Sequence, residues 1–128
     1  MKVLLDTHAF LWLVTGDYRL SEMARQTFLN TENMLFFSAA SLWEICIKIS
    51  LGKISLKRGW LQTIQDEMVV NAIQWLPIEM PHCAELTKLP FHHRDPFDRL
   101  LIAQAMVEDM QLLSRDTHLS AYAIKRVW

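Results

Sequence analysis

Short apolar runs alternate with amphipathic stretches along this chain, and this alternation most constrains its fold. The runs are a few residues long and end at polar or turn-forming residues, which is typical of buried strands. They cover residues 3–5, 34–37, 73–78, 111–113 and 124–128. Strands that alternate with helices form a parallel sheet with helices on both faces. We therefore expect a three-layer α/β domain with a parallel sheet of about five strands.

Helix signals fill the segments between the predicted strands. Ser21 begins one helix, and Asp95 with Pro96 begins another as N-cap and first helical residue. Gly52 ends a third helix, because glycine readily adopts the left-handed conformation that follows a helix. The predicted helices cover residues 8–14, 21–28, 42–51, 60–68, 81–89, 96–107 and 116–122.

Size and composition exclude several classes of protein. The chain has 128 residues, so we predict a single domain over residues 1–128. Hydrophobic residues make up 52% and charged residues 21%, which excludes an intrinsically disordered chain. Cys46 and Cys83 form no disulfide framework or zinc motif, and with only 3 glycines there is no glycine-rich phosphate loop. Neither a signal peptide nor an apolar run of roughly 20 residues is present, so we expect a soluble, cytoplasmic protein.

Acidic residues follow two of the predicted strands and lie near the start of two predicted helices. Asp6 comes directly after the first strand and Asp116 shortly after the fourth, while Glu44 and Asp98 belong to the helices. In a parallel sheet, the carboxyl ends of the strands and the amino ends of the following helices share one edge. Open α/β folds bind their ligands at that edge, so we expect these four acids to converge on one site.

Each acid also has a purely structural interpretation. The two acids that follow strands fit helix N-caps, and Asp98 fits a capping box with Asp95. Glu44 fits a capping box with Ser41 or an ion pair with Lys48. Independent caps need not converge, however, and carboxylates that share a partly buried site raise each other's pKa unless a cation is present. We therefore favour a Mg²⁺ or Mn²⁺ site suited to phosphoryl chemistry.

Four segments, in order along nearly the whole chain, carry a specific combination of residues. They read LLDTH at 4–8, SAASLWEI at 38–45, HHRDPFDRLLIAQA at 92–105 and LSRD at 113–116. Together they resemble the PIN domain and, more narrowly, the VapC-type ribonuclease toxins of prokaryotic toxin–antitoxin pairs. The resemblance implies a five-stranded parallel sheet and a Mg²⁺- or Mn²⁺-dependent endoribonuclease. It places the family's acids on Asp6, Glu44, Asp98 and Asp116, and it implies a small antitoxin that occludes the site and a homodimer.

Two hydroxyl residues adjoin the predicted acids. Thr7, next to Asp6, fits either a bond to the metal shell or a helix cap, and capping is the interpretation we favour. Ser114 stands where the family usually has threonine. Its hydroxyl can still orient Asp116 or a metal-bound water.

Basic residues form one local patch beside the predicted site. His92, His93 and Arg94 lie in a loop, and Arg99 and Arg115 extend the patch. We hypothesise that these side chains contact RNA phosphates, and the alternative is a solvated loop with surface charges. The 5 tryptophans have no interleaved basic residues, so we expect core or interface positions rather than platforms for base stacking.

Two other functions were weighed against a ribonuclease. A non-catalytic PIN-fold binding module would keep the fold without the metal, but the presence of all four acids argues against it. A metal-dependent phosphohydrolase of the haloacid-dehalogenase type needs a second aspartate two positions after the nucleophile, where this chain has His8. We therefore predict a metal-dependent endoribonuclease that acts on RNA as the toxin of a toxin–antitoxin pair.

Overall fold

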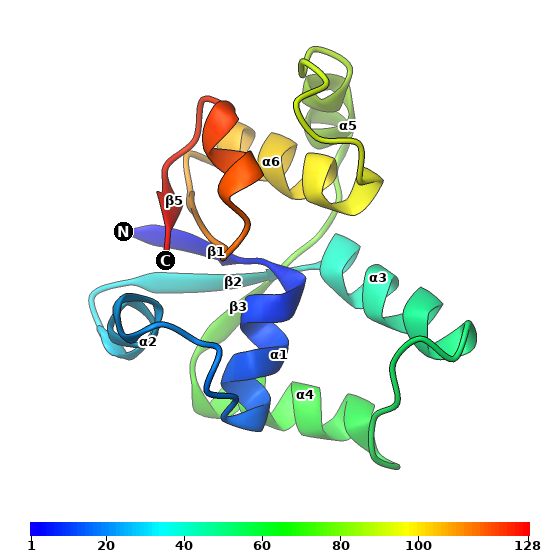
Figure 1. Cartoon of the computed structure of the whole chain (residues 1–128). Helices are drawn as coiled ribbons and strands as arrows, with labels where there is room; N and C mark the ends of the chain where they lie inside the picture. The colour runs from blue at the N-terminus through cyan, green and yellow to red at the C-terminus, as the bar shows by residue number, and fades with distance from the viewer.

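The computed structural model describes residues 1–128 and contains one sheet of five strands (Figure 1). All neighbouring strands are parallel, and their order is β3-β2-β1-β4-β5. The strands are β1 (Lys2–Leu5), β2 (Met34–Ser38), β3 (Ile73–Leu76), β4 (Gln111–Leu113) and β5 (Arg126–Val127). The predicted α/β class with a five-stranded parallel sheet is confirmed.

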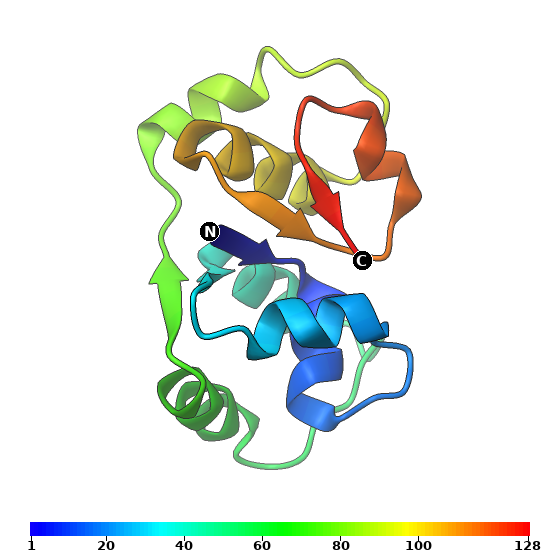
Figure 2. The same cartoon turned by 90° about the vertical axis from the view of Figure 1, so that its left-hand side faces the viewer.

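Helices cover both faces of this sheet. They are α1 (Thr7–Thr15), α2 (Glu22–Leu29), α3 (Ala39–Ser50), α4 (Trp60–Val70), α5 (Met80–Leu86), α6 (Pro96–Glu108) and the 3₁₀ helix η1 (Thr117–Ala121). Figures 1 and 2 show α5 and α6 on one side of the sheet and α1, α2 and α4 on the other. None of these helices is both long enough and apolar enough to span a bilayer.

The central strand β1 contributes side chains to two separate hydrophobic cores. Leu4 packs in the core beneath α6, whereas Val3 and Leu5 pack in the core beneath α1. All three side chains are fully buried. Burial on both faces explains why the strands are continuously apolar rather than alternating in polarity.

The order of the strands defines a switch point at the centre of the sheet. From β1 the chain moves outward through β2 and β3, and it then returns to place β4 on the other side of β1. In open α/β sheets, ligands bind beyond the carboxyl ends of the strands at such a switch point. Asp6 directly follows β1, and Asp116 caps η1 shortly after β4, so both acids lie at this place.

Several element boundaries differ from the sequence prediction. Helix α3 begins at Ala39 rather than at residue 42, because the hydroxyl of Ser38 accepts a hydrogen bond from the Ala40 N–H and caps the helix. The predicted capping role of Ser41 is therefore wrong. Strand β3 ends at Leu76, just before Pro77, which has no N–H to continue the ladder. The last predicted helix is a short 3₁₀ segment, and β5 has only two residues.

Candidate metal centre

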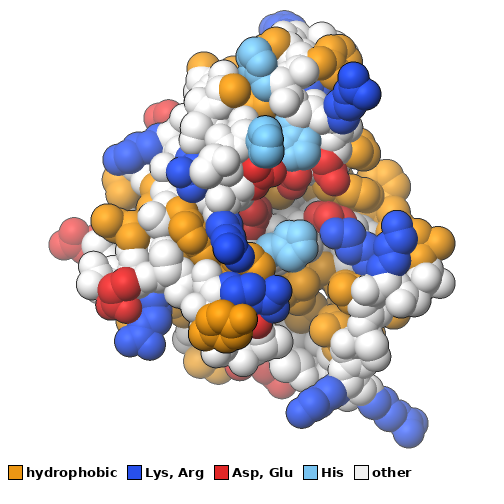
Figure 3. All heavy atoms as spheres, in the orientation of Figure 1, with side chains coloured by type: hydrophobic (Ala, Val, Ile, Leu, Met, Phe, Trp, Pro, Cys, Tyr) orange, Lys and Arg blue, Asp and Glu red, His pale blue; other side chains and the backbone are white.

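The four predicted acids come together at the carboxyl edge of the sheet. Asp6 and Asp116 line one pocket of about 440 Å³. Asp98 and Asp116 each lie within about 3 Å of the same histidine nitrogen, and the negative charges of Glu44 and Asp6 both act on Asp98. Figure 3 shows acidic side chains gathered near the middle of this face, next to histidines. The convergence expected from the topology is present.

Asp6 serves the fold and the site with the same carboxylate. Its Oδ1 accepts a hydrogen bond of 2.7 Å from the Ala9 N–H and so caps α1. The side chain is buried, at 7% exposure. Burial raises the pKa of Asp6, against the lowering effect of hydrogen bonds from the Ser114 side chain and the Ala9 N–H. Ser114 thus contacts Asp6, and its hydroxyl also accepts from the Asp116 N–H at 3.1 Å.

Asp98, like Asp6, is an acid whose charged form a cation would stabilise. Asp95 caps α6 by accepting from the Asp98 N–H at 3.0 Å, but Asp98 returns no bond, so the predicted capping box is absent. Burial raises the pKa of Asp98 to about 7, and the negative charge of Asp95 adds to this effect. His93 opposes the shift without cancelling it, and repulsion from Glu44 and Asp6 adds to it.

Asp116 divides its two oxygens between a helix cap and the acid cluster. Its Oδ1 accepts from the His118 N–H at 2.9 Å and lies 2.9 Å from His118 Nδ1. Its Oδ2 lies 3.0 Å from His93 Nε2. Burial alone would raise the pKa of Asp116, but the hydrogen bonds from His118 and His93 outweigh it and lower the pKa below the ordinary value.

Glu44 differs from Asp98 because both of its oxygens are already paired. It is 4% exposed on α3, and its Oε1 accepts a hydrogen bond of 2.6 Å from the Thr7 hydroxyl. Its Oε2 accepts from Lys48 Nζ at 2.7 Å, which confirms the predicted ion pair. Thr7 therefore supports Glu44 and does not cap α1, whose N-cap is Asp6.

His93 stands between two acids from different elements. Its Nδ1 accepts from the Asp95 N–H at 3.1 Å, so Nε2 carries the proton of the neutral ring. Nε2 donates to Asp116 Oδ2 and lies 3.1 Å from Asp98 Oδ2. His93, Asp98 and Asp116 each offer a ligand atom within 4.8 Å of the others. With Nδ1 engaged, His93 donates to Asp116 and lies against Asp98, and these two carboxylates remain the candidate metal ligands.

The donor set fits a hard divalent cation. Carboxylate oxygens are the preferred ligands of Mg²⁺ and Mn²⁺, and the site contains no thiolate. Burial and the negative charges of Asp95, Glu44 and Asp6 raise the pKa of Asp98, and a cation at the site would favour its charged form. Asp6, Asp98 and Asp116 are thus suited to hold Mg²⁺ or Mn²⁺.

The structure separates the predicted basic residues into two groups. Arg94 is exposed, and the exposed His92 ring packs against Tyr122 with centroids 5.1 Å apart. Arg99 is 7% exposed, and its guanidinium donates to the Pro90 carbonyl at 2.8 Å and to the Tyr122 hydroxyl at 3.3 Å. These bonds tie the loop to α6. Arg99 stays a predicted RNA contact, although its guanidinium is already bonded within the fold.

From the sequence, we did not predict that an aromatic residue and further basic residues lie beside the acids. Of this group, only Arg115 was named as a site residue. The pocket that contains Asp6 and Asp116, which we call the acid pocket, is also lined by Trp12, Arg115, Arg19 and His8. The guanidinium carbons of Arg19 and Arg115 lie 4.8 and 5.9 Å from the centroid of the Trp12 ring. No local pattern could reveal this group, since its two arginines are far apart in the sequence.

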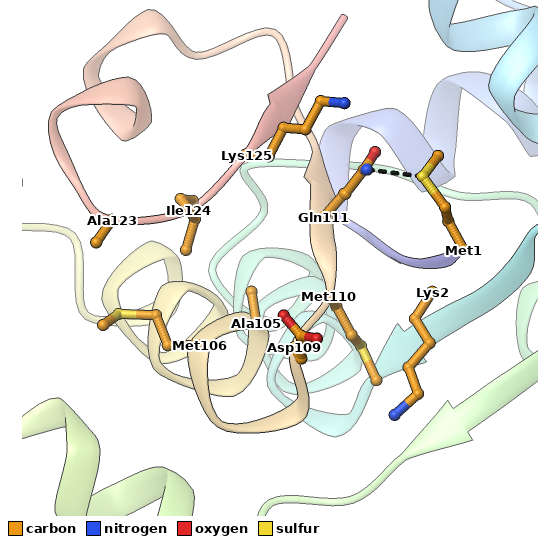
Figure 4. Close-up of a pocket in the computed structure, with 10 residues that line it drawn as sticks. All are labelled: Met1, Lys2, Ala105, Met106, Asp109, Met110, Gln111, Ala123, Ile124 and Lys125. Carbon is orange, nitrogen blue, oxygen red and sulfur yellow. Dashed lines mark hydrogen bonds between the residues drawn. The ribbon is translucent and has the colours of Figure 1, made fainter.

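A larger pocket, of about 810 Å³, lies at the opposite edge of the sheet (Figure 4). Six of its ten lining residues are hydrophobic, Met106 and Ile124 among them, and its charged side chains are Lys2, Lys125 and Asp109. A single acid among lysines offers no set of oxygen ligands for a divalent cation. The larger volume therefore does not mark the candidate metal centre.

Comparisons with known proteins agree with this architecture. The PIN domain family model matches residues 3–125, and no curated protein matches the sequence. VapBC2 from Rickettsia felis, bound to a DNA fragment from its promoter, gives a TM-score of 0.75 at 14% identity over 98% of this chain and 97% of that chain. VapBC-1 from nontypeable Haemophilus influenzae gives 0.64 at 16% identity over 98% and 96%. A toxin–antitoxin complex from Klebsiella pneumoniae gives 0.63 at 18% identity over 98% and 96%. At these identities the structural likeness establishes the fold.

Proposed function

Since the chain belongs to the PIN domain family, we propose that it is a divalent-metal-dependent endoribonuclease and the toxin of a toxin–antitoxin pair. The observation that carries this proposal is the convergence of Asp6, Glu44, Asp98 and Asp116 at the switch point of the sheet. The similar solved structures are toxin–antitoxin complexes, which supports an antitoxin as partner. A homodimer and a cytoplasmic location belong to the same proposal, as family membership implies them.

The aspartates are the proposed metal ligands. Asp6, Asp98 and Asp116 would hold Mg²⁺ or Mn²⁺, which supplies positive charge to a phosphodiester and lowers the pKa of the attacking water. Glu44 completes the acid set, but Thr7 and Lys48 already occupy its oxygens. We therefore expect Glu44 to contribute less to ion binding than Asp98.

The loop of the basic patch positions the site. The Tyr122 hydroxyl accepts from the His93 N–H at 2.9 Å and donates to the Pro90 carbonyl at 2.8 Å. This network holds the His93 imidazole against Asp98 and Asp116. His92 and Arg94, exposed on the same loop, are proposed phosphate contacts.

The test is cleavage of RNA by purified variants that each lose one carboxylate. Asp6→Asn and Asp98→Asn are expected to lower cleavage in Mn²⁺ by at least about a hundredfold, because each change removes a charged ligand of the ion. Asp109→Asn is the matched control, since Asp109 lines the pocket at the opposite edge and asparagine tolerates its left-handed backbone. Full activity of both site variants would overturn the proposal. Failure of the unaltered chain to bind Mn²⁺ would favour a non-catalytic module instead.

A further inference from the structure

The acid pocket also contains cationic and aromatic side chains that the proposed metal chemistry does not use. The pocket of about 440 Å³ is lined by Trp12, Arg19 and Arg115 as well as by Asp6 and Asp116. Figure 3 shows Lys or Arg side chains directly beside the acids on this face. The pocket therefore carries positive charge next to the acids.

Trp12 organises the two arginines. Its half-buried ring packs edge-on against Trp128, with centroids 5.7 Å apart, which holds the indole in place. The guanidinium carbons of Arg19 and Arg115 lie 4.8 and 5.9 Å from the ring centroid, within the range of cation–π attraction. A single indole thus holds two cations contributed by the segment after α1 and by the segment after β4.

Both guanidinium groups keep free donors. Arg19 binds Asp17 through Nε at 3.0 Å and Nη2 at 2.7 Å, and its Nη1 has no acceptor in the chain. The guanidinium of Arg115 makes no hydrogen bond or ion pair within the chain, and this residue is exposed. Asp17 already compensates the charge of Arg19, whereas Arg115 has no partner, so the positive charge of Arg115 beside the ring is available to an anion.

We propose that Arg19 and Arg115, held by Trp12, clamp a phosphate of the RNA strand adjacent to the phosphodiester that is cleaved. The inference rests on the proposed ribonuclease function and identifies how the strand is held. Phosphate is favoured because the guanidinium fork matches its oxygens and because a second phosphate of the same strand necessarily lies next to the one at the acids. An acidic peptide is the competing occupant.

The test measures RNA binding separately from cleavage. In an Asp98→Asn background and in EDTA, the affinity for a labelled single-stranded RNA is measured at several salt concentrations, with and without Arg115→Ala. We expect Arg115→Ala to weaken binding by roughly fivefold or more at low salt and to reduce the slope of log K against log salt by about 0.7, because one phosphate contact is lost. Arg115→Lys should restore affinity only in part, since lysine keeps the charge and lacks the fork.

Arg25→Ala is the matched control, because Arg25 is an exposed arginine on α2, 3.7 Å from Glu22 and outside the pocket. Equal affinities and slopes for Arg115→Ala and Arg25→Ala would overturn the clamp. So would binding of a polyglutamate peptide that depends on Arg115 while RNA binding does not. Loss of RNA binding in Arg115→Ala, with no cleavage by the unaltered chain in Mn²⁺, would support the clamp and contradict the proposed nuclease.

Discussion

The two edges of the sheet differ in chemistry more than in size. The pocket at the amino edge has a volume of about 810 Å³ and a single acid, Asp109, in its lining, whereas that at the carboxyl edge has about 440 Å³ and contains Asp6 and Asp116. In a parallel sheet, the residues that follow strands and begin helices all reach the carboxyl edge. The difference teaches that topology, not cavity volume, locates the cluster of acids in this fold.

Removal of divalent cations should produce the largest difference between the two edges. EDTA is expected to lower RNA cleavage by at least about a hundredfold, because the carboxylates at the carboxyl edge need the ion to act on a phosphodiester. Added Mn²⁺ or Mg²⁺ should restore it. Cleavage that persists in EDTA, from a preparation whose Asp98→Asn variant is inactive, would show that the acids act without a metal.

The pH dependence of the free energy of unfolding should report the raised pKa of Asp98. Asp98 has a pKa of about 7 in the folded chain and about 4 when unfolded, so between these values the folded chain binds more protons. The free energy of unfolding of the metal-free chain should therefore fall as pH rises through this window. Between pH 5 and 8 the loss attributable to Asp98 should be about 2–3 kcal/mol. Urea unfolding of the chain and of Asp98→Asn measures it, and identical pH profiles would contradict the raised pKa.

Thr7→Val tests how much stability the pairing of the Glu44 carboxylate contributes. The substitution removes the hydroxyl that donates to Glu44 at 2.6 Å and leaves a buried carboxylate oxygen unpaired. We expect a loss of about 1–2 kcal/mol in the free energy of unfolding. Urea unfolding checks this value, with Thr31→Val at an exposed position as the control. A loss no larger than that of the control would mean that the bond contributes nothing.

The smallest effect is expected at the amino edge. Lys125→Ala changes a side chain that lines the larger pocket and makes no side-chain hydrogen bond or ion pair. Its stability should stay within about 0.5 kcal/mol of the parent chain, and its cleavage of RNA should be unchanged. A strong loss of cleavage in this variant would place function at the wrong edge for the topological explanation.

The capping and cluster interpretations of the acids prove to be compatible. Asp6 and Asp116 each cap a helix with Oδ1, and a carboxylate has a second oxygen that remains for the site. From the sequence, the two roles were treated as alternatives because each residue was assigned a single role, although a carboxylate has two oxygen atoms. The convergence itself was predictable, since the end of a strand is a local signal and topology supplies the rest.

The basic residues show where prediction from the sequence ends. Arg99 and Arg115 look alike in sequence, yet one is buried against loop carbonyls and the other is exposed over Trp12. Whether a guanidinium is hydrogen-bonded within the fold depends on acceptors contributed by distant parts of the chain, such as the Tyr122 hydroxyl. Such pairings are set by packing between distant segments, which local patterns do not encode.

Calorimetric titration with Mn²⁺ tests most directly whether the converged acids bind a divalent cation. The parent chain and Asp109→Asn should bind with the same affinity, and Asp98→Asn should bind at least about tenfold more weakly, because it loses a charged ligand at the carboxyl edge. Equal binding by Asp98→Asn and Asp109→Asn, or no binding by the parent chain, would show that the four acids do not form a metal centre.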